Sequence, residues 1–337
     1  MKNLFKDYRL PENREEYFTQ LYKMNLEERV MPGLVYLYMP ALAHHFGWDM
    51  EQKLWFAFIN GNTQNPITSL RIFNEFPVIP AERDGFLTFK RWFDDNWDTL
   101  SFDVDRRYQK KELPLAVFTY SSLVTAYGSQ EKLLAGTFSE LWDRVTKGFH
   151  SFGRLAAFSY LEYIKIMGAG AECDEMFWQD KSGSKSHRNG MLFLLGQDEF
   201  VWDKRANNGF DGNYDSFARL CVWLGAEADH YLEQCGIENR HKGYFTLESQ
   251  LCQFKNGFFG RRYPGVYADM ALDRIKWYDD RGFTELTSVF KDIRAEYLPH
   301  WLREECEEKV AHRVYKATMF KETGIPFRAK YFMEEVK

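Results

Sequence analysis

The chain has 337 residues and a formal net charge of −5, and 18% of its residues are aromatic. This length is sufficient for one large domain or two smaller ones, with a substantial hydrophobic core. The net negative charge argues against a protein that coats nucleic acid by bulk attraction, so any contact with DNA must be made in a local basic groove.

Cysteine usage and hydropathy indicate the compartment. The five cysteines are scattered along the sequence and form neither a CxxC zinc pair nor a disulfide framework. The N-terminal segment lacks the apolar run of a signal peptide, and no apolar stretch is long enough to cross a membrane. We therefore expect a cytoplasmic protein with no membrane partner.

The N-terminal part of the sequence has helical periodicity. In residues 13–30, apolar side chains recur with spacings i, i+4 and i+7. Asp49 and Gln52 have the spacing of a capping box, which predicts the start of a helix. Residues 113–124 are compatible with a strand through their β-branched and aromatic content, and with a helix because Pro114 suits a first helical turn.

The C-terminal part repeats this periodicity. An apolar stripe follows Thr246 and predicts a helix that ends near Gly260. A further helix precedes Pro299, and a long one that includes Leu302 is closed near Gly324.

Convincing strands are few, and the sequence contains no internal repeat or low-complexity linker. We therefore predict a mainly α fold, organised as a single large helical body. An N-terminal helical lobe would comprise residues 1–125, and a second helical lobe, residues 126–337, would carry most of the site motifs. The two lobes could also form one continuous domain.

Four arginine-centred clusters lie in aromatic, glycine-punctuated sequence. They are FDVDRRY (102–108), SFGRLAAFSYLEY (151–163), SHRNG (186–190) and FFGRRYPGVYADMALDR (258–274). A guanidinium group is always charged, presents a rigid fork of donors to phosphate or carboxylate oxygens, and stacks on flat rings. The clusters therefore predict an anion site walled by aromatic side chains. Separate surface ion-pair networks are the alternative.

Two of the clusters lie at predicted helix starts. Arg154 follows Gly153, where it could face an anion while Glu162 holds or neutralises it; a solvated stripe is the alternative. In SHRNG, Arg188 and Asn189 precede an apolar run. Amides at the start of that helix would join Arg188 in binding phosphate, and a capping loop is the alternative.

Asp269 and Asp273 are one helical turn apart, and such a like-charge pair costs stability unless a cation lies near. Arg261, Arg262, Arg274 or a metal ion could supply that charge. The carboxylates could serve as a general base for an incoming amine or hold a divalent ion beside a pyrophosphate. Other chemistry lacks support, because GSKS (183–186) is an incomplete Walker A motif and no HExxH or GxSxG motif occurs.

The clusters belong to a longer ordered series. PGLVYLYMPALAHHFGWDMEQKLWFAFINGNTQNPITSLRIFNEFP is followed by FDVDRRY, FGRLAAFSYLE, HRNG and ESQLCQFKNGFFGRRYPGVYADMALDRI. In this order the series resembles the phage amino acid:DNA transferases, the alpha-glutamyl/putrescinyl-thymine pyrophosphorylase group. The resemblance implies a helical protein, distantly related to DNA glycosylases, that hypermodifies thymine-like bases in phage DNA. It also implies a location in the host cytoplasm.

The resemblance implies a reaction and its partners. An upstream kinase converts 5-hydroxymethyluracil in double-stranded DNA to its pyrophosphate ester, and the transferase then replaces pyrophosphate with a small amine or an amino acid. No cofactor would be required, and Mg²⁺ is the one metal considered. The enzyme must hold the base, guide the amine and neutralise the leaving group.

This hypothesis assigns roles to individual residues. The phosphate side of the site would be formed by Arg106, Arg107, Arg154, Arg188, Arg261 and Arg262. Asn189 and Tyr263 would contact the base. The amine would be deprotonated, or a metal bound, by Glu248, Asp269 or Asp273. Two other hypotheses remain open: a glycosylase-like helical module that binds modified bases without chemistry, and a structural protein whose arginines brace aromatic loops.

Overall fold

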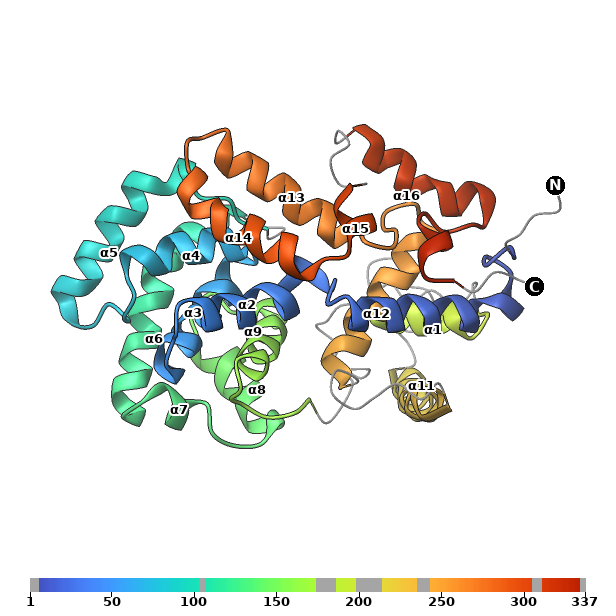
Figure 1. Ribbon diagram of the computed structural model, residues 1–337. Coiled ribbons are helices and arrows are strands. Elements are labelled where there is room, and N and C mark those ends of the chain that lie inside the picture. The colour runs from blue at the N-terminus through green and yellow to red at the C-terminus, as the bar shows by residue number, and fades with distance from the viewer. Residues whose placement is uncertain are drawn as a thin grey trace. The chain divides into compact units, whose positions relative to one another are not determined.

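The computed structural model describes residues 6–103, 107–173, 186–197, 214–234, 243–304 and 311–333. Within these residues the regular secondary structure is helical and no β-strand occurs, as the course of the chain in Figure 1 shows. The predicted mainly α fold is confirmed. The ambiguous segment 113–124 forms the helix α6 (Leu113–Tyr127), which has Pro114 in its first turn.

The chain forms two compact units, each assembled from separate stretches. The first unit comprises Met1–Pro32, Cys173–Met270 and Pro299–Lys337, and the second comprises Gly33–Glu172 and Ala271–Leu298. The division into lobes near residue 125 stays a prediction; residue 125 lies in α6, within the second unit.

The helices of the first unit agree with the periodicity of the sequence. They are α1 (Pro11–Glu27), α10 (Ser186–Leu194), α11 (Tyr214–Gln234), α12 (Tyr244–Phe258), the start of α13 (Val266–Asp279), α15 (His300–Glu304), α16 (Ala311–Thr323) and the 3₁₀ turn η5 (Ala329–Tyr331). As predicted, α12 ends just before Gly260, and α16 ends at Thr323, just before Gly324. The middle of the predicted long C-terminal helix, residues 305–310, lies outside the described residues.

An aromatic cluster holds α1, α12 and α16 together. The ring of Tyr17 lies 5.7 Å from that of Phe254 and 4.9 Å from that of Phe320, measured between centroids. Phe258 packs edge-on against Phe320 at 5.0 Å. Such aromatic pairs contribute about 0.5–1.5 kcal/mol each beyond the area they bury. The cluster therefore gives α12 a rigid support.

The helix α10 lies against α12, and a glycine allows the close approach. A Cβ atom on Gly190 would collide with the carbonyl oxygen of Leu251. On another side of α12, the buried amide of Asn25 donates hydrogen bonds to Gln250 at 2.7 Å and Gln253 at 2.9 Å. These polar contacts fix the register of α1 on α12. The first turn of α10, which contains SHRNG, is thus held against a supported helix.

The second unit contains most of the remaining helices. They are α2 (Val35–His45), α3 (Met50–Thr63), α4 (Pro66–Glu75), α5 (Glu82–Asn96), η2 (Trp97–Thr99), η3 (Arg107–Glu112), α6, α7 (Gln130–Leu133), α8 (Phe138–Gly148), α9 (Arg154–Ile166), the end of α13 and α14 (Thr284–Tyr297). The turn η1 (Pro32–Leu34) leads into this unit. The predicted capping box is confirmed: Gln52 donates its amide to Asp49 Oδ1 at 2.8 Å, and Asp49 donates its amide to Gln52 Oε1 at 3.1 Å.

The core of the second unit is built around α3, which is buried from Leu54 to Thr63 and packs against α9 and α4. Phe58 stacks on Tyr120 with the ring centroids 3.9 Å apart, and it meets Tyr160 edge-on at 6.0 Å. The last turn of α3 is different, because its buried side chains are polar. They position the segments described next.

Candidate active site

The first turn of α10 and the facing turn of α12 bring together His187 and three of the predicted site residues, Arg188, Asn189 and Glu248. His187, Arg188 and Asn189 on α10 are buried, and Arg188 is only 1% exposed. Glu248 on α12 is 8% exposed, and its Oε1 atom lies 3.1 Å from Nδ1 of His187. SHRNG is therefore part of a helix, where the sequence alternative was a capping loop. The paired imidazole and carboxylate can hold or accept a proton.

A second group of side chains, which includes the predicted Tyr263, surrounds Asp269 at the start of α13. Tyr263 donates its hydroxyl to Asp269 Oδ2 at 2.6 Å, Arg328 donates to Oδ1 at 3.0 Å, and the ammonium of Lys316 lies 3.5 Å from Oδ2. All of these side chains are buried. Because two cations and a hydroxyl already engage this carboxylate, it has a strong structural role.

The cations beside Asp269 differ from those considered from the sequence, which were Arg261, Arg262, Arg274 or a metal. Arg328 and Lys316 were not recognised, because they come from the C-terminal segment and no spacing relates them to α13. The turn that precedes α13 is adapted to Arg328: Gly265 has a φ of +77°, and a Cβ atom there would collide with the guanidinium of Arg328. Asp273, one turn further along α13, is half-buried.

Arg261 and Arg262 follow the end of α12. Arg261 is exposed and its guanidinium carbon lies 5.9 Å from the ring centroid of Phe259. Arg262 is half-buried and lies 5.7 Å from the ring centroid of Tyr267. Burial raises the pKa of Tyr267 to about 12, against the opposing charge of Arg262. Of these two guanidinium groups, that of Arg261 is the more accessible to a phosphate.

The other predicted arginines belong to the second unit. Arg106 lies outside the described residues, and Arg107 begins η3, with its side chain also outside them. Arg154 is the first residue of α9 and is half-buried, 5.9 Å from the ring centroid of Phe158. Glu162, on the same helix, is buried and accepts a hydrogen bond from the Tyr36 hydroxyl at 3.0 Å. Convergence of all four arginine clusters in one pocket stays a prediction.

Two of the four clusters do meet within the second unit. Arg274 forms an ion pair with Asp103, the second residue of FDVDRRY. The amide of Asp103 also donates to the carbonyl of Thr63, in the last turn of α3, at 2.9 Å. Burial raises the pKa of the Asp103 carboxyl, and Arg274 opposes this rise. Arg274 was one of the predicted cations for the pair of Asp269 and Asp273, and the structure pairs it with Asp103 instead.

Sequence reasoning also missed Lys110, two residues beyond the FDVDRRY cluster. Its side chain is buried, and its ammonium donates a long hydrogen bond of 3.4 Å to Oδ1 of Asn62 in α3. Burial lowers the pKa of Lys110 to about 8. The only signal available was the basic run RRYQKK, and such a run is ordinarily solvated.

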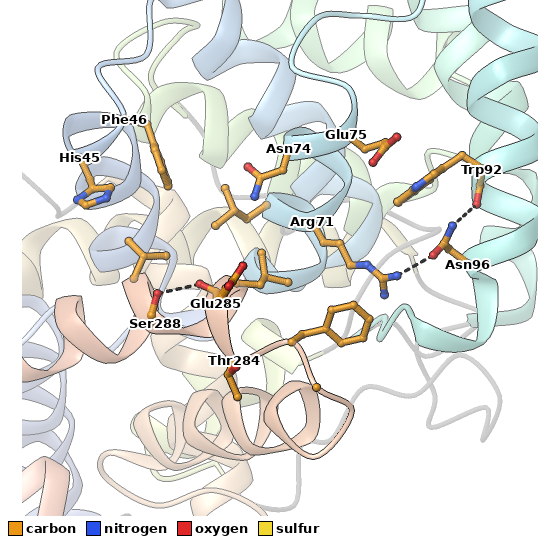
Figure 2. A pocket seen from close by; sticks show the side chains of 15 residues that line it. His45, Phe46, Arg71, Asn74, Glu75, Trp92, Asn96, Thr284, Glu285 and Ser288 are labelled. Carbon is orange, nitrogen blue, oxygen red and sulfur yellow. Dashed lines mark hydrogen bonds between the residues drawn. The ribbon is translucent and has the colours of Figure 1, made fainter.

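A pocket of about 750 Å³ in the second unit is lined by residues of α4, α5 and α14. Figure 2 shows Arg71 pointing across this pocket to Asn96, with which it forms a hydrogen bond of 2.7 Å. Arg71 also donates to the carbonyl of Thr99 at 2.5 Å and lies 4.1 Å from the ring centroid of Phe283. Its guanidinium is therefore engaged by the protein itself.

Comparison with known proteins places this architecture in a family. The model of the amino acid:DNA transferase family matches residues 35–263. The chain belongs to this family. A serinyltransferase of Salmonella phage ViI is 29% identical over an alignment 359 positions long, which covers 95% of this chain and 83% of that protein. No solved structure matches the chain, and the distant likeness to DNA glycosylases stays a prediction.

Some candidate residues of this transferase lie within the segment that matches the family, residues 35–263, and others lie outside that segment. It contains Asp103, Lys110, His187 and Glu248, and it ends at Tyr263. The carboxylates of α13 and the cations that pair with them lie beyond the matched residues. Glu248 is thus the predicted catalytic carboxylate that lies in the matched residues, where it pairs with His187.

Metal and membrane contacts can be examined in the described part of the chain. There, no three His, Cys, Asp or Glu side chains gather closely enough to hold a metal ion. The binding of Mg²⁺ stays a prediction. Among the same residues no helix has both the length and the apolar character needed to span a membrane.

Proposed function

We propose that the protein transfers an amino acid to 5-(pyrophosphoryloxymethyl)uracil in double-stranded DNA. The amino nitrogen forms a bond to the C5 methylene carbon, the bond from this carbon to the pyrophosphate oxygen breaks, and the ammonium proton passes to a base. The observation that carries the proposal is membership of the amino acid:DNA transferases. The similarity to a phage serinyltransferase along 95% of the chain supports it and makes serine the first donor to test.

Pyrophosphate suits this displacement because its departing charge can be neutralised by cations. The electron-rich pyrimidine ring would assist departure through an exocyclic methylene intermediate, which the amine then attacks. Arg261 is exposed at the end of α12 and is assigned to a phosphate oxygen. A fixed guanidinium that meets the charge as it develops lowers the barrier without reorganisation.

Glu248 is the general base in this proposal. Its carboxylate retains some exposure, lies 3.1 Å from His187 Nδ1, and falls in the residues matched by the family. Asp269 is less suited, since its carboxylate oxygens are already engaged by Tyr263, Arg328 and Lys316. Asp273 remains the alternative base. An amino acid is protonated at neutral pH, so the reaction needs such a base before nitrogen can attack.

The test is a product analysis. The protein is incubated with DNA that carries the pyrophosphate ester and with isotopically labelled serine, and then with a pool of amino acids. The DNA is digested and its nucleosides are identified by mass spectrometry, while released pyrophosphate is measured in parallel. DNA with unmodified thymine and DNA with 5-hydroxymethyluracil are the controls.

Equal amounts of pyrophosphate and aminated nucleoside, formed only on the ester, are expected. Amination of 5-hydroxymethyluracil without the ester would refute the pyrophosphate substrate and with it the need for an upstream kinase. Retention of modified DNA with no new nucleoside for any donor would favour a binding module instead.

A further inference from the structure

A pocket of about 570 Å³ lies in the second unit between η3 and the start of α9. It is lined by Lys110, Lys111, Glu112, Phe149, Ser151, Phe152 and Gly153. This volume falls in the range of small-molecule sites. Three of these residues, Ser151, Phe152 and Gly153, belong to the SFGRLAAFSYLEY cluster, whereas Lys110, Lys111, Glu112 and Phe149 were not singled out from the sequence.

Lys110 is the unusual member of this lining. The residue is 7% exposed, and its ammonium donates one long hydrogen bond, to the neutral Oδ1 atom of Asn62 at 3.4 Å, and lies 5.9 Å from the ring centroid of Phe152. Among the described residues, no carboxylate lies within ion-pair distance of it. A buried charge is normally paired or fully hydrogen-bonded, because its desolvation is otherwise uncompensated. The lowered pKa of Lys110 has the same cause.

The N-terminal end of α9 forms another part of the lining. Gly153 is the N-cap residue, and no side chain caps this end of the 13-residue helix. The helix dipole and the first amides favour negative charge at such an end. Ser151, just before it, adopts a left-handed conformation with a φ of +59°. A non-glycine residue in this region is strained, and such strain is concentrated at functional sites.

Glu112, the one carboxylate among the described residues of the lining, is directed to other partners. Glu112 lies 2.9 Å from His150 Nε2 and accepts a hydrogen bond from the Ser151 hydroxyl at 3.3 Å. Lys111 is exposed, and its ammonium lies 5.5 Å from the ring centroid of Trp97. Lys110 and the N-terminal end of α9 therefore both contribute positive charge to the lining of the pocket.

We propose that this pocket is an oxyanion-binding subsite, in which Lys110 and the start of α9 hold a phosphate or carboxylate group. The subsite deepens the proposed function, because that reaction has two oxyanions: the pyrophosphate that leaves and the carboxylate of the amino acid donor. The rings of Phe149 and Phe152 would contact the ligand's carbon atoms or exclude water from it. The pocket beside Arg71 is less suited, since its guanidinium is already engaged by the protein.

Binding to the free protein tests the subsite without DNA and without turnover. Inorganic pyrophosphate and serine are titrated separately into the full-length protein by calorimetry near pH 7. Lys110→Met keeps a side chain of similar length and removes the charge, and Lys132→Met removes an exposed lysine of α7 as the matched control. Loss of a charge-assisted hydrogen bond should weaken binding by about 10- to 100-fold in Lys110→Met alone.

A measurement on the unchanged protein guards against a folding defect of the variant. Brief acetylation at pH 8, followed by peptide mass spectrometry, gives the modification rate of each lysine. The bound oxyanion should slow modification of Lys110 and leave that of Lys132 unchanged. Protection by pyrophosphate alone assigns the subsite to the leaving group, and protection by serine alone assigns it to the donor carboxylate.

The subsite is overturned if neither compound protects Lys110, or if binding is equal in Lys110→Met and the unchanged protein. This result is independent of the proposed function. If the protein forms the aminated nucleoside but Lys110→Met binds both oxyanions normally, the subsite is refuted and the proposed function is retained. If the protein binds pyrophosphate through Lys110 but makes no aminated nucleoside, the proposed function is refuted and the subsite is retained.

Discussion

The carboxylate of Asp103 and the guanidinium of Arg274 form an ion pair in the second unit. The pair joins the first and the last of the four arginine clusters, which are far apart in the sequence. Asp103 is itself fixed by a backbone hydrogen bond to Thr63 at the end of α3. Asp103 therefore connects the segment that precedes η3 both to α3 and to the part of α13 that belongs to the second unit.

Replacing Arg274 should destabilise the protein. Arg274→Met leaves the largely buried Asp103 carboxylate without its cation, and because both side chains keep some exposure the cost should be about 1–2 kcal/mol, below that of a fully buried pair. Urea denaturation measures it. Arg281→Met is the control, since Arg281 is exposed and stacks on Trp277. Adding Asp103→Asn to Arg274→Met should recover part of the loss; full additivity would contradict the pairing.

Much of the fold could be predicted from local sequence. The apolar period of α1 and the capping box of α3 are local signals, and they gave the correct elements. In α6 the apolar residues surround the helix, so periodicity could not separate strand from helix. Pro114 in its first turn was the signal that favoured the observed helix.

The site was less predictable, because its contacts depend on tertiary packing. His187 and Glu248 meet only since Gly190 lets α10 approach α12. The cations of Asp269 come from the C-terminal segment. Lys110 belongs to a basic run whose composition does not tell which lysine is buried. Candidate site residues could therefore be predicted from the sequence, but the residues that contact them could not.

Glu248→Gln should abolish most of the transfer while the protein stays folded. Removing a general base lowers the rate by about 10²–10⁴-fold. Single-turnover transfer at saturating amino acid, with DNA affinity measured separately, distinguishes loss of chemistry from loss of binding. Asp273→Asn is the comparison, since Asp273 is the alternative base. A normal rate in Glu248→Gln with a large loss in Asp273→Asn would transfer the role to α13.

Asp269→Asn should mainly lower the stability of the protein. The change leaves Arg328 and Lys316 buried without their shared counter-charge, and breaking a buried ion pair from one side costs about 3–5 kcal/mol. Asp280→Asn, at an exposed position just after α13, is the control and should change little. Urea denaturation gives both values. Unchanged stability together with lost transfer would instead support the catalytic role predicted for Asp269 from the sequence.

DNA binding should depend on salt through a small number of phosphate contacts. If Arg261 contacts a phosphate, Arg261→Ala should weaken binding to different DNA sequences alike and reduce the slope of log affinity against log salt by about one. Lys23→Ala removes the same charge from an exposed position on α1 and should leave the slope unchanged. Fluorescence anisotropy over a salt series is the measurement. An equal slope for Arg261→Ala and the unchanged protein would exclude this contact.

Lys110 should give the stability of the protein a characteristic pH dependence. Burial lowers the pKa of Lys110 from its ordinary value of 10.5 to about 8 in the folded protein, so the unfolded chain binds more protons between these two values. The contribution of Lys110 to the free energy of unfolding therefore rises with pH between about 8 and 10.5. Below pH 8 the destabilisation caused by burying the charged ammonium is fully present.

Lys110→Met removes this cost. The variant should therefore be more stable than the unchanged protein at pH 7, and its advantage should shrink as the pH approaches 10. Comparing the two proteins at each pH cancels the titration of the many other groups. Thermal melts at pH 7, 8, 9 and 10 give the difference, with Lys132→Met as the control whose difference should be flat. An advantage that grows with pH would contradict a lowered pKa, and pyrophosphate, by pairing with the ammonium, should reduce the advantage at pH 7.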